Sequence, residues 1–276
     1  MADICVVHLV RAKNGVEPFC NFLESYSNHE SGIDHDLLIV FKGFSGGKGT
    51  AQYRQLLKDI SFQTVYVRDC GFDIRSYFVA TNTVNNRYLC FLNSFSTILD
   101  HDWLLKMNVH LTKPNIGLVG ATGSYESAYS NLLMEQKSIG ATKSQCARLR
   151  HFLARAKYKH YFDPFPNYHI RTNGFMISRD AMREIRHGFI LSKMDAHRFE
   201  SGKQSLTKQV LQMNLDVRVI GKNGEDYRME DWCRPDTFRQ RDQNNLLIAD
   251  NQTNAYLHAD AELKRRLSEY AWGTGI

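Results

Sequence analysis

The sequence predicts an α/β fold in which helices cover both faces of a mostly parallel sheet. Continuous apolar runs, each long enough for one strand, alternate with short amphipathic helical patterns. The apolar runs are typical of strands that are buried on both faces. Segments that alternate at this spacing form a parallel sheet, and ligands bind beyond the carboxyl ends of its strands. The expected strands are 4–10, 36–41, 64–69 and 88–93, and the expected helices are 16–26, 50–59 and 74–87.

The second half of the chain alternates less regularly. We expect strands at 116–121, 169–178 and 216–221, and helices at 179–188 (ending at Gly188), 206–213 and 261–272. A polar, loop-like tail runs from about residue 222 to 255. No internal repeat, low-complexity tract or linker interrupts the chain, so a single domain over residues 1–276 is expected.

Composition indicates an ordinary globular protein. Hydrophobic residues make up 43% of the 276 residues and aromatic residues 12%, which argues against disorder. The six cysteines form no C-x-x-C pair, so we expect reduced thiols in a cytoplasmic protein rather than a zinc site or disulfides. The N-terminus lacks the pattern of a signal peptide, and the apolar-leaning stretch 88–99 is too short to span a bilayer. We therefore expect a soluble protein.

Positive charge is concentrated in one segment. The net charge is +6, and residues 143–160 carry six Lys or Arg and two His without an acid. A helix there places Leu149, Phe152, Leu153 and Ala156 on one face. Two interpretations stay open: a solvated face on a core helix, or a docking surface for phosphate-bearing acceptors or anionic lipid, with peripheral contact at the inner face of the membrane. The modest overall charge and the lack of interleaved exposed aromatics argue against a nucleic-acid partner.

The glycine-rich stretch GFSGGKGT (43–50) is not a P-loop. A P-loop requires G-x-x-x-x-G-K-[ST] because its backbone N–H groups wrap phosphates and its hydroxyl holds magnesium. With Lys48 as the motif lysine, Lys42 takes the place of the first glycine and Gly49 that of the hydroxyl residue. We interpret the stretch as a loop between a strand and a helix.

Four stretches in order resemble a glycosyltransferase of the GT-A fold, close to family 2. They are DCGFDIRSYFVATNTVNNRYLCFLNSFS (69–96), NIGLVGATG (115–123), RTNGFMISRDAM (171–182) and FESGKQSLTKQVLQMNLDVRVIG (199–221). The resemblance, which covers residues 4–221, implies a UDP-, GDP- or dTDP-linked sugar donor. It implies a polysaccharide or lipid-linked acceptor, as in cell-envelope polysaccharide biosynthesis. Residues 1–110 would bind the donor, 111–221 would form the acceptor side, and 222–276 would be a lid-like tail and helix.

The sequence departs from the family at its metal motif. Members carry Asp-x-Asp at the end of the fourth strand, and its carboxylates bind a divalent cation. Here the position reads Asn93-Ser94-Phe95, which offers a neutral carbonyl oxygen and a phenyl ring. We therefore name no metal ligand and no certain cofactor, and leave Mg²⁺ or Mn²⁺ open. Members also carry an Asp pair after the second strand, where this chain has none.

Without metal ligands, fixed cations are the expected partners of the departing diphosphate. The candidates are Arg11, Lys13, Arg75, Arg171, Arg234, Arg239 and Arg241, with Arg239 and Arg241 favoured because the tail could close as a lid. Together with strand-end residues, they give the expected donor-binding set: Val10, Arg11, Gly43, Lys48, Asp69, Arg75, Asn93, Ser94, Arg239 and Arg241. For Asp69, contact with the nucleotide base and a cap of the next segment stay open.

Glu200 is the expected catalytic base, with Asp195 as the alternative. Glu200 matches the family's acidic motif and precedes the helix at 206–213, whose dipole would keep it ionised. An acid at a helix start explains the residue equally well. One carboxylate acting alone would imply inversion at the anomeric carbon. The expected acceptor-binding residues are His169, Arg171, Asn173 and Trp232. For His169 a structural role in its strand stays open, and for Trp232 packing on the core is the default alternative.

A second function is open beside transfer. Because the Asp-x-Asp motif is missing, the chain could be a catalytically inactive relative that binds sugars or nucleotides or acts as a scaffold.

Overall fold

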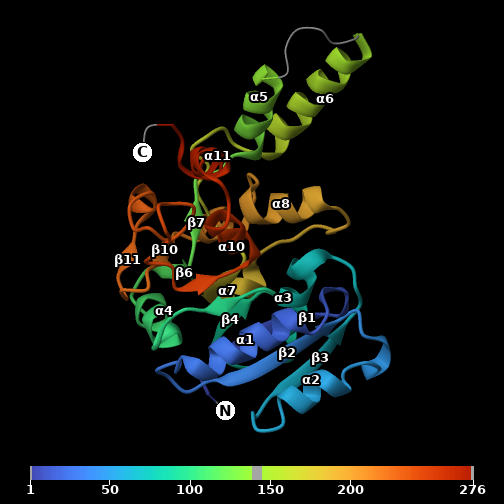
Figure 1. Cartoon of the computed structure of the whole chain (residues 1–276), viewed down its shortest axis with the longest axis vertical. Helices are drawn as coiled ribbons and strands as arrows, with labels where there is room; N and C mark the ends of the chain where they lie inside the picture. The colour runs from blue at the N-terminus through green and yellow to red at the C-terminus, as the bar shows by residue number, and fades with distance from the viewer. Residues whose placement is uncertain (1, 139–144, 275–276) are drawn as a thin grey trace.

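One eight-stranded sheet forms the centre of the molecule (Figure 1). The computed structural model describes residues 2–138 and 145–274. In order across the sheet, the strands are β11 (Asp226–Tyr227), β10 (Asp216–Ile220), β6 (Ile116–Gly120), β9 (Gly174–Ser178), β4 (Tyr88–Leu92), β1 (Ile4–Arg11), β2 (Asp36–Lys42) and β3 (Gln63–Val67). Strands β1 to β4 are parallel, as are β6 and β10, whereas β9 and β11 run antiparallel to their neighbours. The expected α/β fold with a mostly parallel sheet is confirmed.

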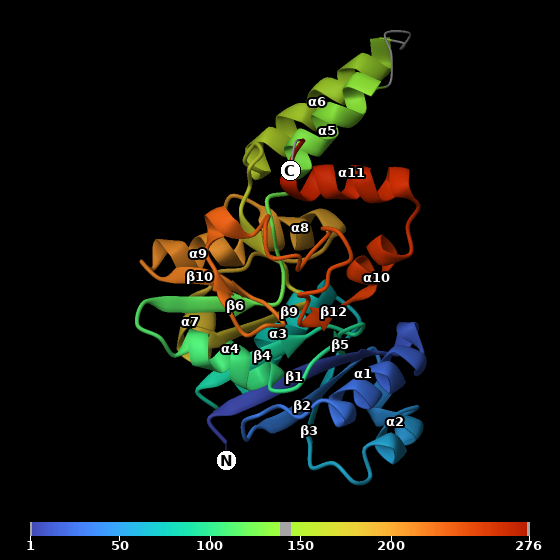
Figure 2. The same cartoon turned by 60° about the vertical axis from the view of Figure 1, so that its left-hand side comes forward.

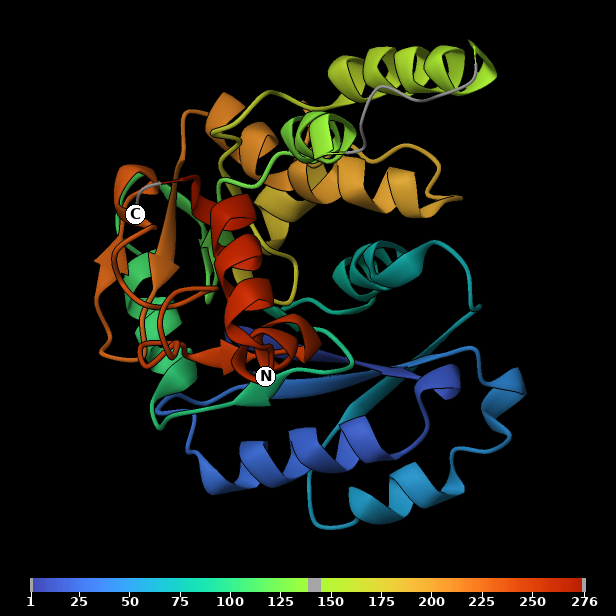
Figure 3. The same cartoon turned by 45° about the horizontal axis from the view of Figure 1, so that its top comes forward.

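Helices cover both faces of the sheet (Figure 3). On one face, α1 (Glu17–Asn28), α2 (Ala51–Leu56) and α4 (Trp103–Leu111) pack on a core that includes Val6 and Val10. On the other face, α3 (Phe72–Thr83), α7 (Arg179–Glu184) and α9 (Leu206–Gln212) pack on a core that includes Val7 and Leu9. Alternate residues of β1 thus enter two different cores, which is why its sequence is apolar without a break.

Shorter elements complete the chain. Two small antiparallel pairs, β5 (Thr97–Ile98) with β12 (Ile248–Ala249) and β7 (Gly123–Ser124) with β8 (His169–Ile170), lie beside the main sheet. The remaining helices are α5 (Ala128–Ser138), α6 (Gln145–Tyr161), α8 (Lys193–Ser201), α10 (Asn251–Leu257) and α11 (Ala261–Trp272), with short 3-10 turns at η1 (Ala12–Asn14), η2 (Ser45–Gly47) and η3 (Met229–Asp231).

Several expected elements differ from the structure: the helices expected at 50–59 and 74–87 end earlier, at Leu56 and Thr83, and two further differences follow. The strand expected at 169–178 is two strands, β8 and β9, which belong to different sheets and are separated at residues 171–173. The helix expected at 179–188 ends after Glu184, and its C-cap is the extended residue Ile185 rather than Gly188. The break between β8 and β9 matters for the site, because it turns residues 171–173 away from the ladder.

The helical hairpin of α5 and α6 projects from the body of the molecule (Figures 1 and 2). The helix expected over 143–160 is α6, and residues 143–144 lie outside the described part of the chain. Leu149, Phe152 and Leu153 are all more than half exposed, so the apolar face of α6 is not part of the core.

Within the described residues, every helix is too short or too polar to cross a lipid bilayer.

Candidate active site at the carboxyl edge of the sheet

The carboxyl ends of β1 and β3 meet in an ion-pair cluster. Arg11, the last residue of β1, donates from Nε to Asp69 Oδ1 at 2.8 Å, and Lys13 Nζ lies 3.1 Å from Asp69 Oδ2. The hydrogen bond from Arg11 holds the pKa of the Asp69 carboxyl below its usual range, and Lys13 acts in the same direction. The parallel register of β1, β2 and β3 brings these side chains together, although Asp69 is 58 residues from Arg11.

A second pair of ionisable side chains, Lys42 and Asp73, lies at the carboxyl end of β2 and the start of α3. The side chain of Lys42, the last residue of β2, is buried, and its ammonium donates to the Phe72 carbonyl oxygen. Burial lowers the pKa of Lys42, while burial raises the pKa of Asp73 in the first turn of α3. We call Arg11, Lys13, Lys42, Asp69 and Asp73 the edge cluster.

Gly43 allows the edge cluster to form. Its N–H donates to the Val67 carbonyl at 2.8 Å, its φ is +80°, and an added Cβ would lie 3.1 Å from the Asp69 Cβ. A side chain at this position would therefore press on the carboxylate that pairs with Arg11. The rest of the GFSGGKGT stretch forms η2 and the entry to α2, and Lys48 is exposed there.

The Asn93-Ser94-Phe95 segment does not fit a divalent cation. Asn93 Oδ1 accepts hydrogen bonds from the Phe95 N–H at 2.8 Å and from Ser96 Oγ at 3.2 Å, so its carbonyl oxygen closes its own turn. The Ser94 side chain is buried, and the exposed Phe95 ring offers no ligand atom. Among residues 2–138 and 145–274, no group of three or more His, Cys, Asp or Glu side chains is arranged to hold a metal ion.

A cavity of about 320 Å³ lies between α8, β8 and the segment that leads to α10. We call it the α8 cavity. It contains three residues of the expected acceptor and donor sets, namely His169, Arg171 and Arg239, and the expected base Glu200. The other lining residues are Ser124, Glu126, Ala128, Lys193, His197, Ser201, Phe238 and Gln252.

Two arginines in the wall of the α8 cavity share one aromatic ring. The guanidinium carbons of Arg171 and Arg239 lie 4.2 Å and 4.9 Å from the centre of the Phe238 ring. Arg171 pairs with Asp250 at 2.9 Å, and Arg239 pairs with Glu126 at 2.9 Å. Burial lowers the pKa of Arg239, and the Glu126 charge opposes that change.

His169 is a neutral residue of the same wall. It is buried, and burial lowers its pKa, so the imidazole carries no charge at neutral pH. Its Nδ1–H donates to the Asn167 carbonyl at 2.9 Å. This tautomer leaves Nε2 as a hydrogen-bond acceptor on a residue that lines the cavity.

Glu200 connects the cavity with the edge cluster. Its Oε1 accepts from the Thr172 backbone N–H at 3.0 Å and from the Thr172 hydroxyl at 3.3 Å. Burial is the main cause of the raised pKa of Asp73, and the charges of Lys42 and Arg11 act against it. The negative charge of Glu200 raises the pKa of Asp73 further. The two carboxylates therefore lie within electrostatic range of each other, and Glu200 also lines the α8 cavity.

Glu200 does not lie at the start of a helix, contrary to the expectation from the sequence. Glu200 lies in the last turn of α8, and the N-cap of the following helix α9 is Ser205. The negative end of a helix dipole, rather than the positive end, is nearest to this carboxylate. Its local polar contacts are instead the two hydrogen bonds that it accepts from Thr172.

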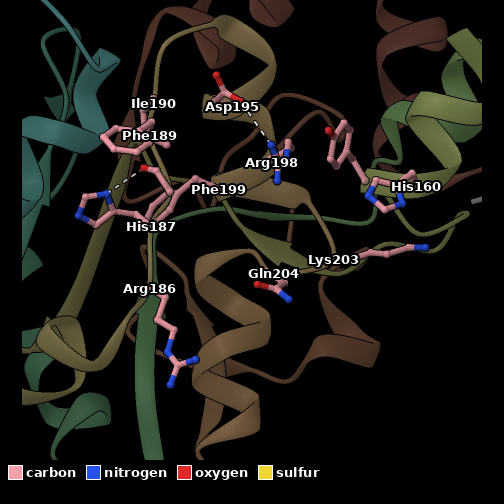
Figure 4. A pocket seen from close by; sticks show the side chains of 12 residues that line it. His160, Arg186, His187, Phe189, Ile190, Asp195, Arg198, Phe199, Lys203 and Gln204 are labelled. Atoms are coloured by element: carbon pink, nitrogen blue, oxygen red, sulfur yellow. Dashed lines mark hydrogen bonds and ion pairs between the residues drawn. The ribbon is translucent and has the colours of Figure 1, made fainter.

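Asp195 faces a different cavity (Figure 4). This second cavity, of about 330 Å³, lies on the other side of α8, and Figure 4 shows Asp195 beside Arg198 in its wall. The Asp195 carboxylate accepts from the Ser192 N–H at 2.9 Å and hydroxyl at 2.8 Å in a capping box, and the Ser192 hydroxyl holds the Asp195 pKa low. Asp195 is thus engaged as a helix cap.

Several other expected site residues do not line the α8 cavity and form no side-chain hydrogen bond or ion pair with the edge cluster among the described residues. Val10 and Trp232 are core residues, and the Trp232 indole donates to the Tyr227 carbonyl at 3.0 Å. Arg75 and Arg241 are exposed. Asn173 is buried beside the α8 cavity, where its Oδ1 accepts from Thr122 and its Nδ2 has no partner among the described residues.

Some residues of the site were not anticipated. Lys42 and Asp73 belong to the edge cluster, and Glu126, Thr172 and Asp250 fix the charged groups of the α8 cavity. Lys42 directly follows an expected strand, so its position at a strand end was a usable signal. Glu126 and Asp250 are 113 and 79 residues from their arginine partners, and no local pattern marks them.

Comparisons with known proteins show similarity of fold only. No family model matches the sequence, and no curated protein is similar to it in sequence. Among solved structures, the chain is similar to mannosyltransferase PcManGT from Pyrobaculum calidifontis, in complex with GDP-Man and Mn²⁺ (TM-score 0.48, 12% identity, 78% of this chain and 54% of that chain). It is also similar to core-mannan synthase A from Aspergillus fumigatus (TM-score 0.39, 9% identity, 78% and 69%) and to S. aureus TarS 1–349 (TM-score 0.43, 10% identity, 75% and 55%). The chain spans about half the length of PcManGT and of TarS 1–349.

Proposed function

We propose that this chain transfers a sugar from a nucleotide-diphosphate sugar to a glycan or lipid-linked acceptor. The observation that carries the proposal is the position of Glu200, which lines the α8 cavity and interacts electrostatically with Asp73 of the edge cluster. A carboxylate between a cationic strand edge and an adjoining cavity is the arrangement that transfer between two bound substrates requires. Such strand ends are also where ligands bind in open α/β sheets.

The edge cluster is the proposed donor site. Arg11 and Lys13 bring two side-chain cations to the end of β1, where a diphosphate would gain charge-assisted hydrogen bonds, and the buried Lys42 lies at the neighbouring end of β2. Asp69 is the proposed acceptor of a hydrogen bond from the nucleotide base. In the present arrangement Asp69 is occupied by Arg11 and Lys13, so donor binding exchanges these ion pairs for contacts with the nucleotide.

The α8 cavity is the proposed acceptor site. Glu200 uses Oε1 for its two hydrogen bonds to Thr172, and Oε2 has no hydrogen-bond partner among the described residues. Oε2 is therefore free to take the proton of an acceptor hydroxyl. His169 and Arg171 supply an acceptor and a donor for sugar hydroxyls in the same wall.

The proposed step is a single displacement. Glu200 removes the proton from the acceptor hydroxyl as its oxygen forms a bond to the anomeric carbon. The bond between that carbon and the diphosphate oxygen breaks, and the nucleoside diphosphate leaves with the electron pair. The cations of the edge cluster stabilise the charge that develops on the leaving phosphate. Attack opposite the leaving group inverts the anomeric carbon.

A divalent cation has no assigned ligands in this proposal. Asn93 closes its own turn and Phe95 supplies no ligand atom, so we derive no step through a metal.

The inactive-relative interpretation has one observation in its favour. The Asp69 carboxylate, proposed to contact the nucleotide base, is already paired with Arg11 and Lys13, as in a purely structural ion pair. A protein of this kind would bind nucleotides or sugars without turning them over.

A turnover screen separates the two functions. The full chain is incubated with UDP-, GDP- and dTDP-linked sugars and candidate glycan acceptors, and released nucleoside diphosphate is measured with and without EDTA. Acceptor-dependent release that Glu200→Gln abolishes is the expected result. If nucleotides bind but none of the donors is consumed with any acceptor, the inactive interpretation replaces the proposal.

A further inference from the structure

The outward face of α6 is more apolar than its inward face. The inward residues His151, Ala154 and Tyr158 are half-buried, and α6 packs chiefly against α5. Leu149, Phe152 and Leu153 point outward, with 59%, 67% and 57% of their surface exposed. Core-facing helices show the opposite distribution, so this stripe calls for a partner outside the described chain.

Basic side chains border this apolar stripe on both sides. At about 100° per residue, Arg150 and Lys157 fall on one side of Leu149 and Phe152, and Arg148 and Arg155 fall on the other. All four are exposed, and none forms an ion pair with another described residue. Because Gln145–Tyr161 contains no Asp or Glu, nothing on α6 itself neutralises these charges.

We propose that α6 docks on the surface of an anionic lipid bilayer. Leu149, Phe152 and Leu153 enter the boundary between headgroups and acyl chains, and the flanking arginines and lysines contact the lipid phosphates. Long basic side chains at the borders of an apolar stripe suit this position, because their stems stay in the apolar layer while their charges reach the headgroups. The projection of the α5–α6 hairpin from the body leaves the stripe free to reach a flat surface (Figures 1 and 2).

Charge complementarity favours a lipid surface over two other partners. A second copy of the chain would bring another helix that is rich in basic residues and contains no acid against the first, and the like charges would repel. Nucleic acid would match the basic side chains but would leave the exposed Leu and Phe stripe without an apolar partner. Of these three partners, the anionic bilayer alone offers negative charge and apolar depth in the same place.

A tryptophan at position 152 reports insertion directly. The three native tryptophans, Trp103, Trp232 and Trp272, are almost fully buried, so Phe152→Trp adds the exposed indole whose fluorescence responds to lipid. The variant is mixed with vesicles of phosphatidylcholine alone or of phosphatidylcholine with phosphatidylglycerol. We expect the indole fluorescence to shift to shorter wavelength with the vesicles that contain phosphatidylglycerol but not with phosphatidylcholine vesicles. Raising the salt concentration should release the protein from the anionic vesicles.

Two variants separate the apolar and the charged contributions in vesicle co-sedimentation. Leu149→Ser, Phe152→Ser and Leu153→Ser combined should abolish binding while the charge is unchanged. The combined variant Arg148→Gln, Arg150→Gln and Arg155→Gln should bind anionic vesicles roughly a hundredfold more weakly, because each basic side chain near an anionic surface raises the affinity about fivefold. Leu56→Ser with Val109→Ser is the matched control, since both side chains are exposed on α2 and α4 and should leave binding unchanged.

Three outcomes overturn the proposal. Failure of the wild type to bind anionic vesicles, or equal binding by the serine variant, would remove the role of the stripe. Self-association without lipid that the serine variant abolishes would assign the stripe to a second copy of the chain. Because all substituted residues are exposed, unchanged melting temperatures should accompany every variant, and transfer activity is not part of the readout.

Discussion

The Glu200 carboxylate accepts two hydrogen bonds from Thr172, one from its backbone N–H at 3.0 Å and one from its hydroxyl at 3.3 Å. Both bonds reach Oε1, so the rotation of the carboxylate is restrained, and Oε2 has no hydrogen-bond partner among the described residues. Thr172 is itself fixed by Tyr77, whose hydroxyl donates to the Thr172 carbonyl at 2.8 Å. The break between β8 and β9 thus holds the candidate base in place.

Glu200→Gln should remove transfer while leaving donor binding unchanged. The glutamine amide oxygen can keep both bonds to Thr172, but it cannot take a proton, so the rate should fall by about 10²- to 10⁴-fold. Nucleotide affinity is measured beside the rate of nucleoside diphosphate release.

Asp195→Asn is the matched control on the same helix. Because Asp195 caps α8 and faces the other cavity, its loss should cost about 1 kcal/mol of unfolding free energy and leave the rate near that of the wild type. A large rate loss in Asp195→Asn with an active Glu200→Gln would exchange the two assignments.

Arg11→Gln should weaken nucleoside diphosphate binding by about ten- to a hundredfold, since a hydrogen bond to a charged group contributes about 1.5–3 kcal/mol. Arg11 borders the proposed diphosphate position and is restrained by Asp69. Calorimetric titration measures the change. Arg234→Gln serves as control, because its side chain is 77% exposed and pairs with Asp231 within the tail. Equal affinities of Arg11→Gln and wild type would move the donor away from the strand ends.

Gly43→Ala should lower the free energy of unfolding by about 1–2 kcal/mol, because alanine is strained at a φ of +80°. The added Cβ would also press on the Asp69 Cβ at 3.1 Å and disturb the edge cluster. Thermal and urea unfolding measure the effect. Gly188→Ala is the control, since nothing lies within 4 Å of its added Cβ and its φ is not positive. A Gly43→Ala protein as stable as Gly188→Ala would contradict the close packing assigned to this loop.

His8 should make the fold less stable in mild acid. Burial lowers its pKa from 6.5 to about 3, both ring nitrogens lack hydrogen-bond partners among the described residues, and the ring stacks on Phe22 with 3.6 Å between centroids. Between these two pKa values the unfolded chain binds one more proton than the folded chain, so stability falls as the pH falls. The contribution is about 1.4 kcal/mol per pH unit.

Urea unfolding at pH 7 and pH 5 tests this effect. In His8→Leu the loss of stability between the two pH values should be smaller than in the wild type by about 2 kcal/mol. His258→Gln, a substitution of an exposed histidine, should retain the wild-type difference. If His8→Leu shows the same pH dependence as the wild type, His8 is not the group that titrates.

The sheet was predictable from the sequence because its central strands are buried on both faces. In β1, for example, side chains enter both cores, and the uninterrupted apolar run shows this directly. Helix α8 was missed although Ser192 and Asp195 form a capping box, which is a local signal. Without α8, the sequence places Glu200 before the helix at 206–213, whereas in the structure it lies in the last turn of α8.

The walls of the α8 cavity were less predictable. The pairs Arg239–Glu126 and Arg171–Asp250 join residues 113 and 79 positions apart, and only the folded chain brings them together. The apolar face of α6 has the same period as a core helix, so the sequence pattern could not show that it faces outward. Trp232 packs in the core, which is the default interpretation of an aromatic residue in a polar tail, rather than in the acceptor site.

The central claim is that side-chain cations of the edge cluster, rather than a divalent cation at Asn93, neutralise the donor diphosphate. Calorimetric titration of UDP, GDP and dTDP, with excess EDTA and then with Mn²⁺, tests it most directly. We expect at least one nucleotide to bind equally well in both conditions, and to bind more weakly in Arg11→Gln. Binding that appears only with Mn²⁺ and is unaffected by Arg11→Gln would contradict the claim.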